Sequence, residues 1–250
     1  MTKTAPCGLI PGLLLLVVGT VHADSIGVNF GTNNGIIAPT AMAGAAPFAQ
    51  ANFNNIQQFN ATAFNLKDNN GTATTASLIS QNSGYANIII TPAGADEILN
   101  SQCFIGDGTN NWSFTISGIP YAVYSLIVYD LASSGQEQGV NVGGTTFYSS
   151  SPTPVAFGYL DQNTATPFTY RQATSTVLAS PTPNSDYVVF TGLTGDSQTV
   201  NMIGFSASPF SFVTATGFQI VAAPEPSVTA LGALGLVSLV LLKRRRSADF

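Results

Sequence analysis

Three tyrosines and one tryptophan are candidates for binding a carbohydrate. A flat aromatic ring packs against the apolar face of a sugar, while polar neighbours complete the hydrogen bonds. Tyr148, Tyr159 and Tyr170 occur in or beside a stretch rich in Ser, Thr and Pro, where we expect short edge strands and long loops. Trp112 alternates with apolar residues, so a position in the core is the better interpretation of it.

Two short polar segments are candidates for binding calcium. The first, residues 106–111, offers Asp107 and Asn111, and the second, residues 161–163, offers Asp161 and Asn163. Oxygen ligands on loops suit a hard cation. Neither segment matches the twelve-residue calcium loop with its terminal Glu, and loops of Asp, Asn and Gly also form plain turns.

A glycoside hydrolase commonly requires a pair of catalytic carboxylates. Such an enzyme places two acids about 5 to 9.5 Å apart across the sugar bond. Asp130, at the end of a predicted central strand, and Glu137, in the following loop, are the candidate pair. Ten acids scattered over a surface readily offer some pair, so a surface glycosidase or lyase stays an alternative and we assign no catalytic residue.

Residues that the chain lacks narrow the chemistry further. The one histidine, His22, lies in a predicted leader, which leaves no Ser-His-Asp or Cys-His catalysis and no histidine ligand for zinc or copper. Cys103 is the one cysteine of the body, where it fits a small buried residue. Phosphate loops, nucleophile elbows and dinucleotide fingerprints are also missing. The sequence therefore predicts a protein that is not an enzyme and needs no cofactor.

The body between Asp24 and Ala223 is strongly acidic. Its bases are Lys67 and Arg171, and ten acids against these two give a formal charge of −8. Neutralising phosphates requires cations, so we exclude nucleic acid as a partner. The acids are Asp24, Asp68, Asp96, Glu97, Asp107, Asp130, Glu137, Asp161, Asp186 and Asp196.

Hydrophobic alternation predicts an all-β fold over residues 24–221. Residues 112–117 put apolar side chains on one face and hydroxyls on the other, and residues 121–129 are apolar on both faces, as in a central strand. Gly143-Gly144 predicts a hairpin between residues 139–142 and 145–148. We expect a helix over 93–100, and an ambiguous helical or extended segment over 48–59. The other expected strands are residues 25–30, 63–66, 85–90, 187–190, 198–203, 210–213 and 217–221.

The N-terminal 23 residues have the layout of a signal peptide. Lys3 gives a positive start, residues 9–18 are apolar, and Val21-His22-Ala23 places small residues where signal peptidase cleaves. Cleavage after Ala23 would leave Asp24 first. A retained N-terminal anchor is the alternative, but it needs a longer apolar span.

The C-terminal 29 residues, 222–250, combine three features in a fixed order. A Pro-Glu-Pro motif precedes an uncharged stretch, residues 227–242, which as a helix would reach roughly 24 Å and approach the thickness of a bilayer core. A basic cluster then ends it, which orients the body outward. The motif is Pro224, Glu225 and Pro226, and the basic cluster is Lys243, Arg244, Arg245 and Arg246.

This tail resembles the PEP-CTERM sorting signal of Gram-negative bacteria. The resemblance implies recognition by an exosortase, a membrane-embedded cysteine transpeptidase that removes the tail and passes the protein toward the cell surface, usually in bacteria that build exopolysaccharide. We therefore expect anchoring in the membrane by the C-terminal helix, followed by release to the surface or the extracellular matrix. A plain C-terminal membrane anchor is the alternative.

The body resembles galactose-binding-like jelly rolls and related carbohydrate-binding modules. The resemblance rests on the Ile-Ser-Gly-Ile-Pro turn at 116–120, the strand ending Val128-Tyr129-Asp130, and the closing Gly-Phe-Gln-Ile-Val strand at 217–221. It implies an antiparallel β-sandwich that associates with polysaccharide. A structural matrix protein without a ligand is the alternative.

Overall fold

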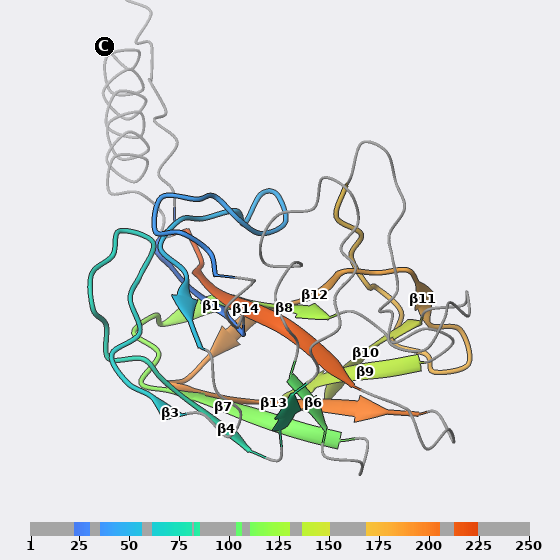
Figure 1. Cartoon of the computed structure of the whole chain (residues 1–250). Coiled ribbons are helices and arrows are strands. Elements are labelled where there is room, and N and C mark those ends of the chain that lie inside the picture. Colours follow the sequence, from blue (N-terminus) through green and yellow to red (C-terminus); the bar gives the residue numbers. More distant parts are fainter. Residues whose placement is uncertain are drawn as a thin grey trace, which may run out of the picture.

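Two β-sheets make up the part of the chain that the structure describes. The structure, a computed structural model, describes residues 23–30, 36–56, 62–81, 83–85, 104–106, 111–130, 137–150, 169–205 and 213–224. Sheet I has the order β12-β8-β14-β1-β2, with β6 paired to β14 and β5 to β6. Sheet II has the order β11-β10-β9-β13-β7-β4-β3. Figure 1 shows the two sheets lying one above the other.

In the described part of the chain, each sheet contains seven strands. Sheet I contains β1 (Ser25–Asn29), β2 (Asn54–Asn55), β5 (Ser83–Tyr85), β6 (Phe104–Gly106), β8 (Val123–Asp130), β12 (Tyr187–Thr194) and β14 (Thr214–Ala222). Sheet II contains β3 (Thr62–Ala63), β4 (Ser77–Gln81), β7 (Asn111–Ser117), β9 (Glu137–Val142), β10 (Thr145–Ser150), β11 (Thr182–Pro183) and β13 (Ser197–Gly204).

Hydrophobic patterning placed the long strands correctly. In β7 buried residues alternate with exposed or half-buried ones, as its alternating sequence predicts. β8 is central, between β12 and β14, and it is buried on both faces over its second half. The β9–β10 hairpin is also confirmed, with Gly143 and Gly144 at φ 57° and 85°, which a tight turn between twisted strands requires.

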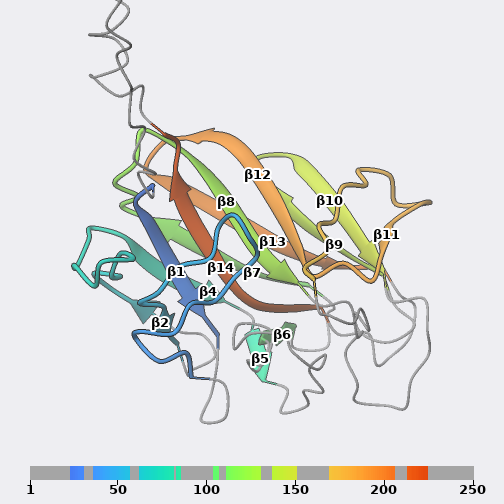
Figure 2. The same ribbon diagram turned by 90° about the horizontal axis from the view of Figure 1, so that it is seen from above.

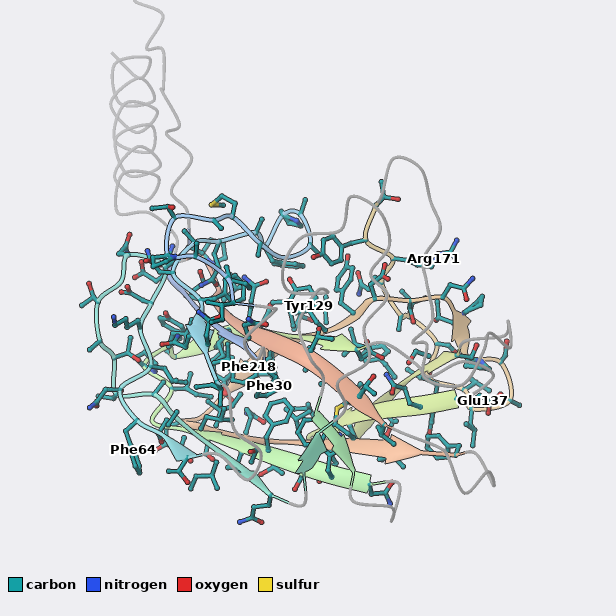
Figure 3. All side chains as sticks on the ribbon, in the orientation of Figure 1. Phe30, Phe64, Tyr129, Glu137, Arg171 and Phe218 are labelled. Carbon is teal, nitrogen blue, oxygen red and sulfur yellow. The ribbon has the colours of Figure 1, made fainter. Side chains whose placement is uncertain are left out.

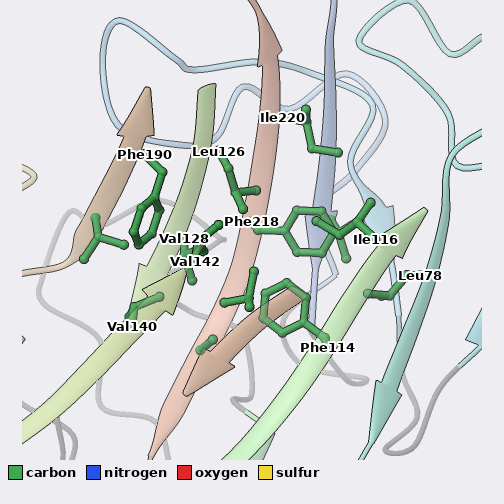
Figure 4. Packing of buried hydrophobic residues seen from close by; sticks show 14 of the residues in the cluster. Leu78, Phe114, Ile116, Leu126, Val128, Val140, Val142, Phe190, Phe218 and Ile220 are labelled. Carbon is green, nitrogen blue, oxygen red and sulfur yellow. The ribbon is translucent and has the colours of Figure 1, made fainter. Parts of the chain in front are cut away.

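The main core fills the space between the two sheets. Sheet I contributes the inward side chains of β1, β8, β12 and β14, and sheet II contributes those of β4, β7, β9 and β13. Phe114 of β7 stacks on Phe218 of β14 with ring centroids 5.1 Å apart, and Phe30 packs edge-on against Phe114 at 5.5 Å. Figure 4 shows Phe114 and Phe218 meeting between the strands. The described fold is therefore all-β and sandwich-like.

A second apolar cluster lies on the outer face of sheet I. Residues 36–56, which we call the covering segment, cross this face over β1, β14 and β8 (Figure 2). The segment contributes Ile37 and Phe53, which pack with the outward side chains of Ile127, Tyr129 and Val189. Ile37 is completely buried and Phe53 is 6% exposed.

Buried amides and a phenol fasten the covering segment to sheet I. The Tyr129 hydroxyl accepts a hydrogen bond from the Ala45 N–H at 2.9 Å and donates one to Gln219 Oε1. Gln219 Nε2 in turn donates to the Phe48 carbonyl at 2.7 Å and to Gln50 Oε1 at 2.9 Å. These bonds satisfy polar groups that would otherwise be costly to bury.

Three expectations differ from the structure or lie at least partly outside the described residues. The sheets are mixed instead of purely antiparallel, because β1 pairs with β2 and β10 with β11 in parallel. Both added strands are two-residue pieces reached through long connections, which allow a parallel approach. The ambiguous 48–59 segment is extended at β2, where the description stops at residue 56, and the expected helix over 93–100 lies outside the described residues.

Candidate functional site: the outer face of sheet II

The outer face of sheet II differs from that of sheet I because no described segment crosses it (Figure 1). Its outward side chains form rows across the strands, since cross-strand neighbours lie side by side on one face. One row is Ser77, Ser117 and Ser197, and the next is Ile79, Thr115 and Thr199. The longest row is Gln81, Ser113, Asn201, Asn141 and Thr146. We call this surface the open face.

Side-chain hydrogen bonds order the polar groups of the open face. The Thr115 and Thr199 hydroxyl oxygens lie 3.0 Å apart, and Asn141 Nδ2 donates to Thr146 Oγ1 at 2.8 Å. Thr199 is exposed, and Thr115, Asn141 and Thr146 are half-buried. Hydroxyls and amides that are already oriented lose less entropy when they bind a polar ligand.

An aromatic pair lies at one end of the open face. The fourth row contains Asn111, Ile203, Gly139 and Tyr148 in neighbouring strands. The ring of Phe205 lies over Gly139, where an added Cβ would be 2.9 Å from the ring edge. Tyr148 and Phe205 have ring centroids 5.3 Å apart in a tilted arrangement, and Phe205 is 36% exposed. We call Tyr148 and Phe205 the aromatic platform.

Charge is scarce on the open face. Among the outward strand residues that the structure describes, Glu137 at the start of β9 is the one charged side chain. Arg171 Nη1 donates to the Pro183 carbonyl of β11 at 3.0 Å, and Figure 3 shows Arg171 on the side of the molecule opposite the open face. A face built of hydroxyls, amides and two rings suits a neutral polar ligand better than an ionic one.

The structure separates the aromatic residues that the sequence suggested. Tyr148 is half-buried on the open face, while Tyr170 packs against Tyr129 and Tyr187 on the side of sheet I. Trp112 is 3% exposed and its indole N–H donates to the Val213 carbonyl at 2.9 Å, so the core position is confirmed and a sugar cannot reach its ring. Tyr159 lies outside the described residues.

Sequence reasoning missed Phe205, the second ring of the platform. Phe205 directly follows β13, one residue beyond the alternating pattern, and it shields a glycine that offers no side chain of its own. The predicted hairpin places a glycine opposite a tyrosine, and aromatic side chains commonly cover such glycines. This pairing could have predicted a second ring near Tyr148.

The calcium candidates are almost all outside the described residues. Asn111 is described, and its Oδ1 accepts a hydrogen bond from the Gly204 N–H at 3.0 Å. Asp107, Asp161 and Asn163 are not described. Within the described ranges, no three His, Cys, Asp or Glu side chains form a group that could hold a metal ion.

The candidate carboxylate pair lies in two different environments. Asp130 points between the sheets and is completely buried, whereas Glu137 is exposed. Burial raises the Asp130 pKa from 3.8 to about 6, although hydrogen bonds from Ser149 and Gln138 oppose that rise. Asp130 Oδ1 has no hydrogen-bond partner among the described residues.

The terminal signals are described only at their inner ends. Ala23 is half-buried and Pro224 is exposed, while residues 1–22 and 225–250 lie outside the described part. The latter include Glu225, Pro226 and the basic residues 243–246. In the described part of the chain, no helix is long and apolar enough to cross a membrane.

No protein-family model matches the chain, and no curated protein matches it significantly in sequence.

Proposed function

We propose that this protein is exported to the cell surface or extracellular matrix and binds neutral polysaccharide through the open face. One observation carries the binding proposal: the aromatic platform of Tyr148 and Phe205 adjoins rows of uncharged hydroxyls and amides. Rings supply apolar stacking area, and oriented polar groups supply hydrogen bonds, which is the combination that sugars need.

The dimensions of the open face suit an extended oligosaccharide. The longest polar row runs across five strands, β4, β7, β13, β9 and β10. With strands about 4.8 Å apart, this row measures roughly 19 Å. The platform adjoins its β10 end, so a chain lying across the strands would stack there and form hydrogen bonds along the row.

Charge favours a neutral polysaccharide over an anionic one. The open face presents Glu137 and no described cation, and the body carries a formal charge of −8. A polymer of uronic acids would meet repulsion here without compensating ion pairs.

The proposed export route leaves the sheets intact. Signal peptidase would cleave after Ala23, and β1 begins at Ser25, where it pairs with Val221 of β14. β14 ends at Ala222, two residues before Pro224. An exosortase acting at the Pro-Glu-Pro motif would therefore remove no strand residue, and both processed ends would leave from the same end of the neighbouring strands β1 and β14.

The strand order also supports the finer proposal of a jelly-roll-like domain over residues 24–221. The chain passes between the sheets from β7 to β8, from β8 to β9, and again between β12, β13 and β14. The first strand, β1, pairs with the last, β14. Repeated crossing of this kind is how jelly rolls build two facing sheets.

A polysaccharide co-sedimentation panel with the full-length protein tests the binding proposal. We expect saturable binding to at least one neutral glucan or mannan, and weak binding to uronic-acid polymers. Tyr148→Ala should weaken neutral binding about tenfold, because a stacking ring contributes on the order of 1.4 kcal/mol. Parallel runs with and without calcium would show whether calcium contributes to binding, for which Asp107, Asn111, Asp161 and Asn163 are the candidate ligands.

Phe64→Ala is the matched control. Phe64 is 70% exposed and lies at the β3 edge, well away from Glu137 and the platform end of the open face (Figure 3). Removing this ring should leave binding unchanged. Equal losses in the two variants, or no binding to any neutral polysaccharide, would overturn the proposal and favour a structural matrix role.

A further inference from the structure

A buried group of reactive side chains lies between the sheets at one end of the sandwich. It consists of Asp130 of β8, Gln138 of β9, Ser149 of β10 and the backbone of Thr214 in β14. Each of the three side chains is at most 1% exposed. The open face does not involve them, so their arrangement is independent of the proposed glycan binding.

The arrangement brings a nucleophile and an amide to the same carboxyl oxygen. Ser149 Oγ donates to Asp130 Oδ2 at 2.7 Å, and Gln138 Nε2 donates to that oxygen at 2.9 Å. Ser149 and Gln138 are also directly opposite each other in the β9–β10 pairing. Cβ atoms of such a pair lie about 4.5 to 5.5 Å apart, so the Ser149 hydroxyl and the Gln138 amide belong to neighbouring side chains on the same face of the hairpin.

The carbonyl of the same amide is oriented and polarised. Gln138 Oε1 accepts a hydrogen bond from the Thr214 N–H at 3.1 Å. A backbone N–H in this position stabilises negative charge that develops on a carbonyl oxygen during nucleophilic attack. Ser149, Asp130 and Thr214 therefore supply the nucleophile, the proton carrier and the oxyanion donor of an acyl transfer.

From this geometry we infer that Ser149 and Gln138 form an intramolecular ester bond. Ser149 Oγ attacks Gln138 Cδ, and the hydroxyl proton passes to Asp130. The carbon–nitrogen bond of the amide then breaks, Asp130 delivers the proton to Nε2, and one molecule of ammonia leaves. One C–O bond replaces one C–N bond, and nothing is oxidised or reduced.

The surroundings suit both the reaction and its product. A carboxyl group whose pKa lies near 6 can take up and release a proton near neutral pH. Burial keeps water from the ester, which would otherwise hydrolyse. The bond would join the open ends of β9 and β10 in a body with a single cysteine and no internal disulfide, and so would limit unfolding of this hairpin.

Mass spectrometry of the full-length protein tests the inference without any variant. Chymotrypsin can cleave after Phe147 and Tyr148, which separates Gln138 from Ser149 unless a bond joins them. We expect a linked peptide pair, lighter by one ammonia than the two free peptides. Mild alkaline hydrolysis should separate the pair and leave glutamate at position 138. Free peptides with unchanged Gln138, or a simple deamidation at position 138, would overturn the inference.

Variants test the role of each group. Ser149→Ala should abolish the linked peptide, whereas Ser80→Ala, which removes another buried serine of sheet II, should retain it. Asp130→Asn keeps a hydrogen-bond acceptor but cannot carry the proton, so it should slow formation about 100-fold or more. Linkage in Ser149→Ala, or an undiminished rate in Asp130→Asn with native circular dichroism, would contradict the assignment.

Discussion

The outer faces of the two sheets differ in whether a described segment covers them. Sheet I hides its outer face beneath residues 36–56, with Ile37 completely buried and a phenol–amide network fixing the segment in place. No described segment crosses the outer face of sheet II, which carries Ser, Thr and Asn rows and the platform of Tyr148 and Phe205. Apolar residues on a sheet face require a cover, whereas ordered hydroxyls and amides do not.

Under the proposed function, the covered face of sheet I contributes mainly to stability and the open face of sheet II to glycan binding. Changes on the covered face should cost folding free energy and leave glycan binding intact in the remaining folded protein. Changes on the open face should weaken glycan binding and leave the folding free energy nearly unchanged.

Among changes on the covered face, Phe53→Ala should lower the unfolding free energy most. Phe53 is 6% exposed against the outward side chains of sheet I, so truncation leaves a cavity and should cost about 4 kcal/mol of unfolding free energy. Urea denaturation measures this loss. Phe64→Ala, at a 70% exposed ring, should cost no more than about 0.5 kcal/mol. Similar costs at the two positions would show that the segment does not cover sheet I tightly.

The buried Asp130 should affect stability through pH without touching either outer face. Its folded pKa, about 6, exceeds the ordinary 3.8, so the folded state holds the proton more tightly than the unfolded state does. This stabilisation is complete below about pH 4 and is lost as pH rises to about 6, a change of about 3 kcal/mol.

Asp130→Asn provides the reference for this titration. Unfolding free energy measured against pH should show the fall from about pH 4 to about pH 6 in the wild type and not in the variant. Subtracting the two curves removes the opposing contributions of surface carboxylates. Parallel curves would mean that Asp130 is not shielded from solvent as the structure describes.

Tyr129→Phe should have a smaller effect on the covered face. The change removes only the hydroxyl, which leaves the Ala45 N–H and Gln219 Oε1 without that partner. A loss of about 2 kcal/mol in thermal or urea unfolding is expected. Polysaccharide binding by the folded variant should match the wild type. A binding defect would contradict the proposal that the covered face takes no part in binding.

Thr199→Ala should have the smallest effect on stability and a clear effect on binding. Thr199 is exposed beside Thr115 on the open face, so folding should change by no more than about 0.5 kcal/mol. Loss of one hydrogen bond to a neutral glycan should weaken binding about fivefold in calorimetry. Thr191→Ala, an exposed strand threonine of sheet I, is the control and should bind normally.

The sequence predicted the strands better than it predicted their surroundings. Alternation in residues 112–117 identified a strand with one buried face, and the doubly apolar residues 121–129 identified a central strand. Both features depend on the local pattern of apolar residues. Gly143-Gly144 identified the hairpin for the same reason: its backbone requirement is local.

The covering segment was not predictable in the same way. Residues 36–56 include seven alanines and show no regular strand or helix period, and their amides act through distant partners. Asn55, for example, accepts from the Asn29 side chain at 2.8 Å and from the Ile37 N–H at 3.0 Å. Such bonds depend on the tertiary fold, so the composition of the segment does not predict them.

The candidate site was predicted in part. Tyr148 was identified, but its neighbour Phe205 follows a separate strand and meets it only because β13 pairs with β9 and β9 with β10. The outward hydroxyls of residues 112–117 were visible as an alternation, whereas their alignment into rows required the register of four further strands.

Hydroxyl-radical footprinting of the full-length protein, with and without the neutral polysaccharide that binds best, tests the division between the faces most directly. The reagent oxidises accessible aromatic and sulfur side chains, so one experiment reports on the platform and on internal controls. The polysaccharide should protect Tyr148 and Phe205, while Met42 on the covering segment and Phe64 at the β3 edge should stay equally reactive. Protection of Met42 or Phe64 with unchanged Tyr148 and Phe205 would contradict the proposed division.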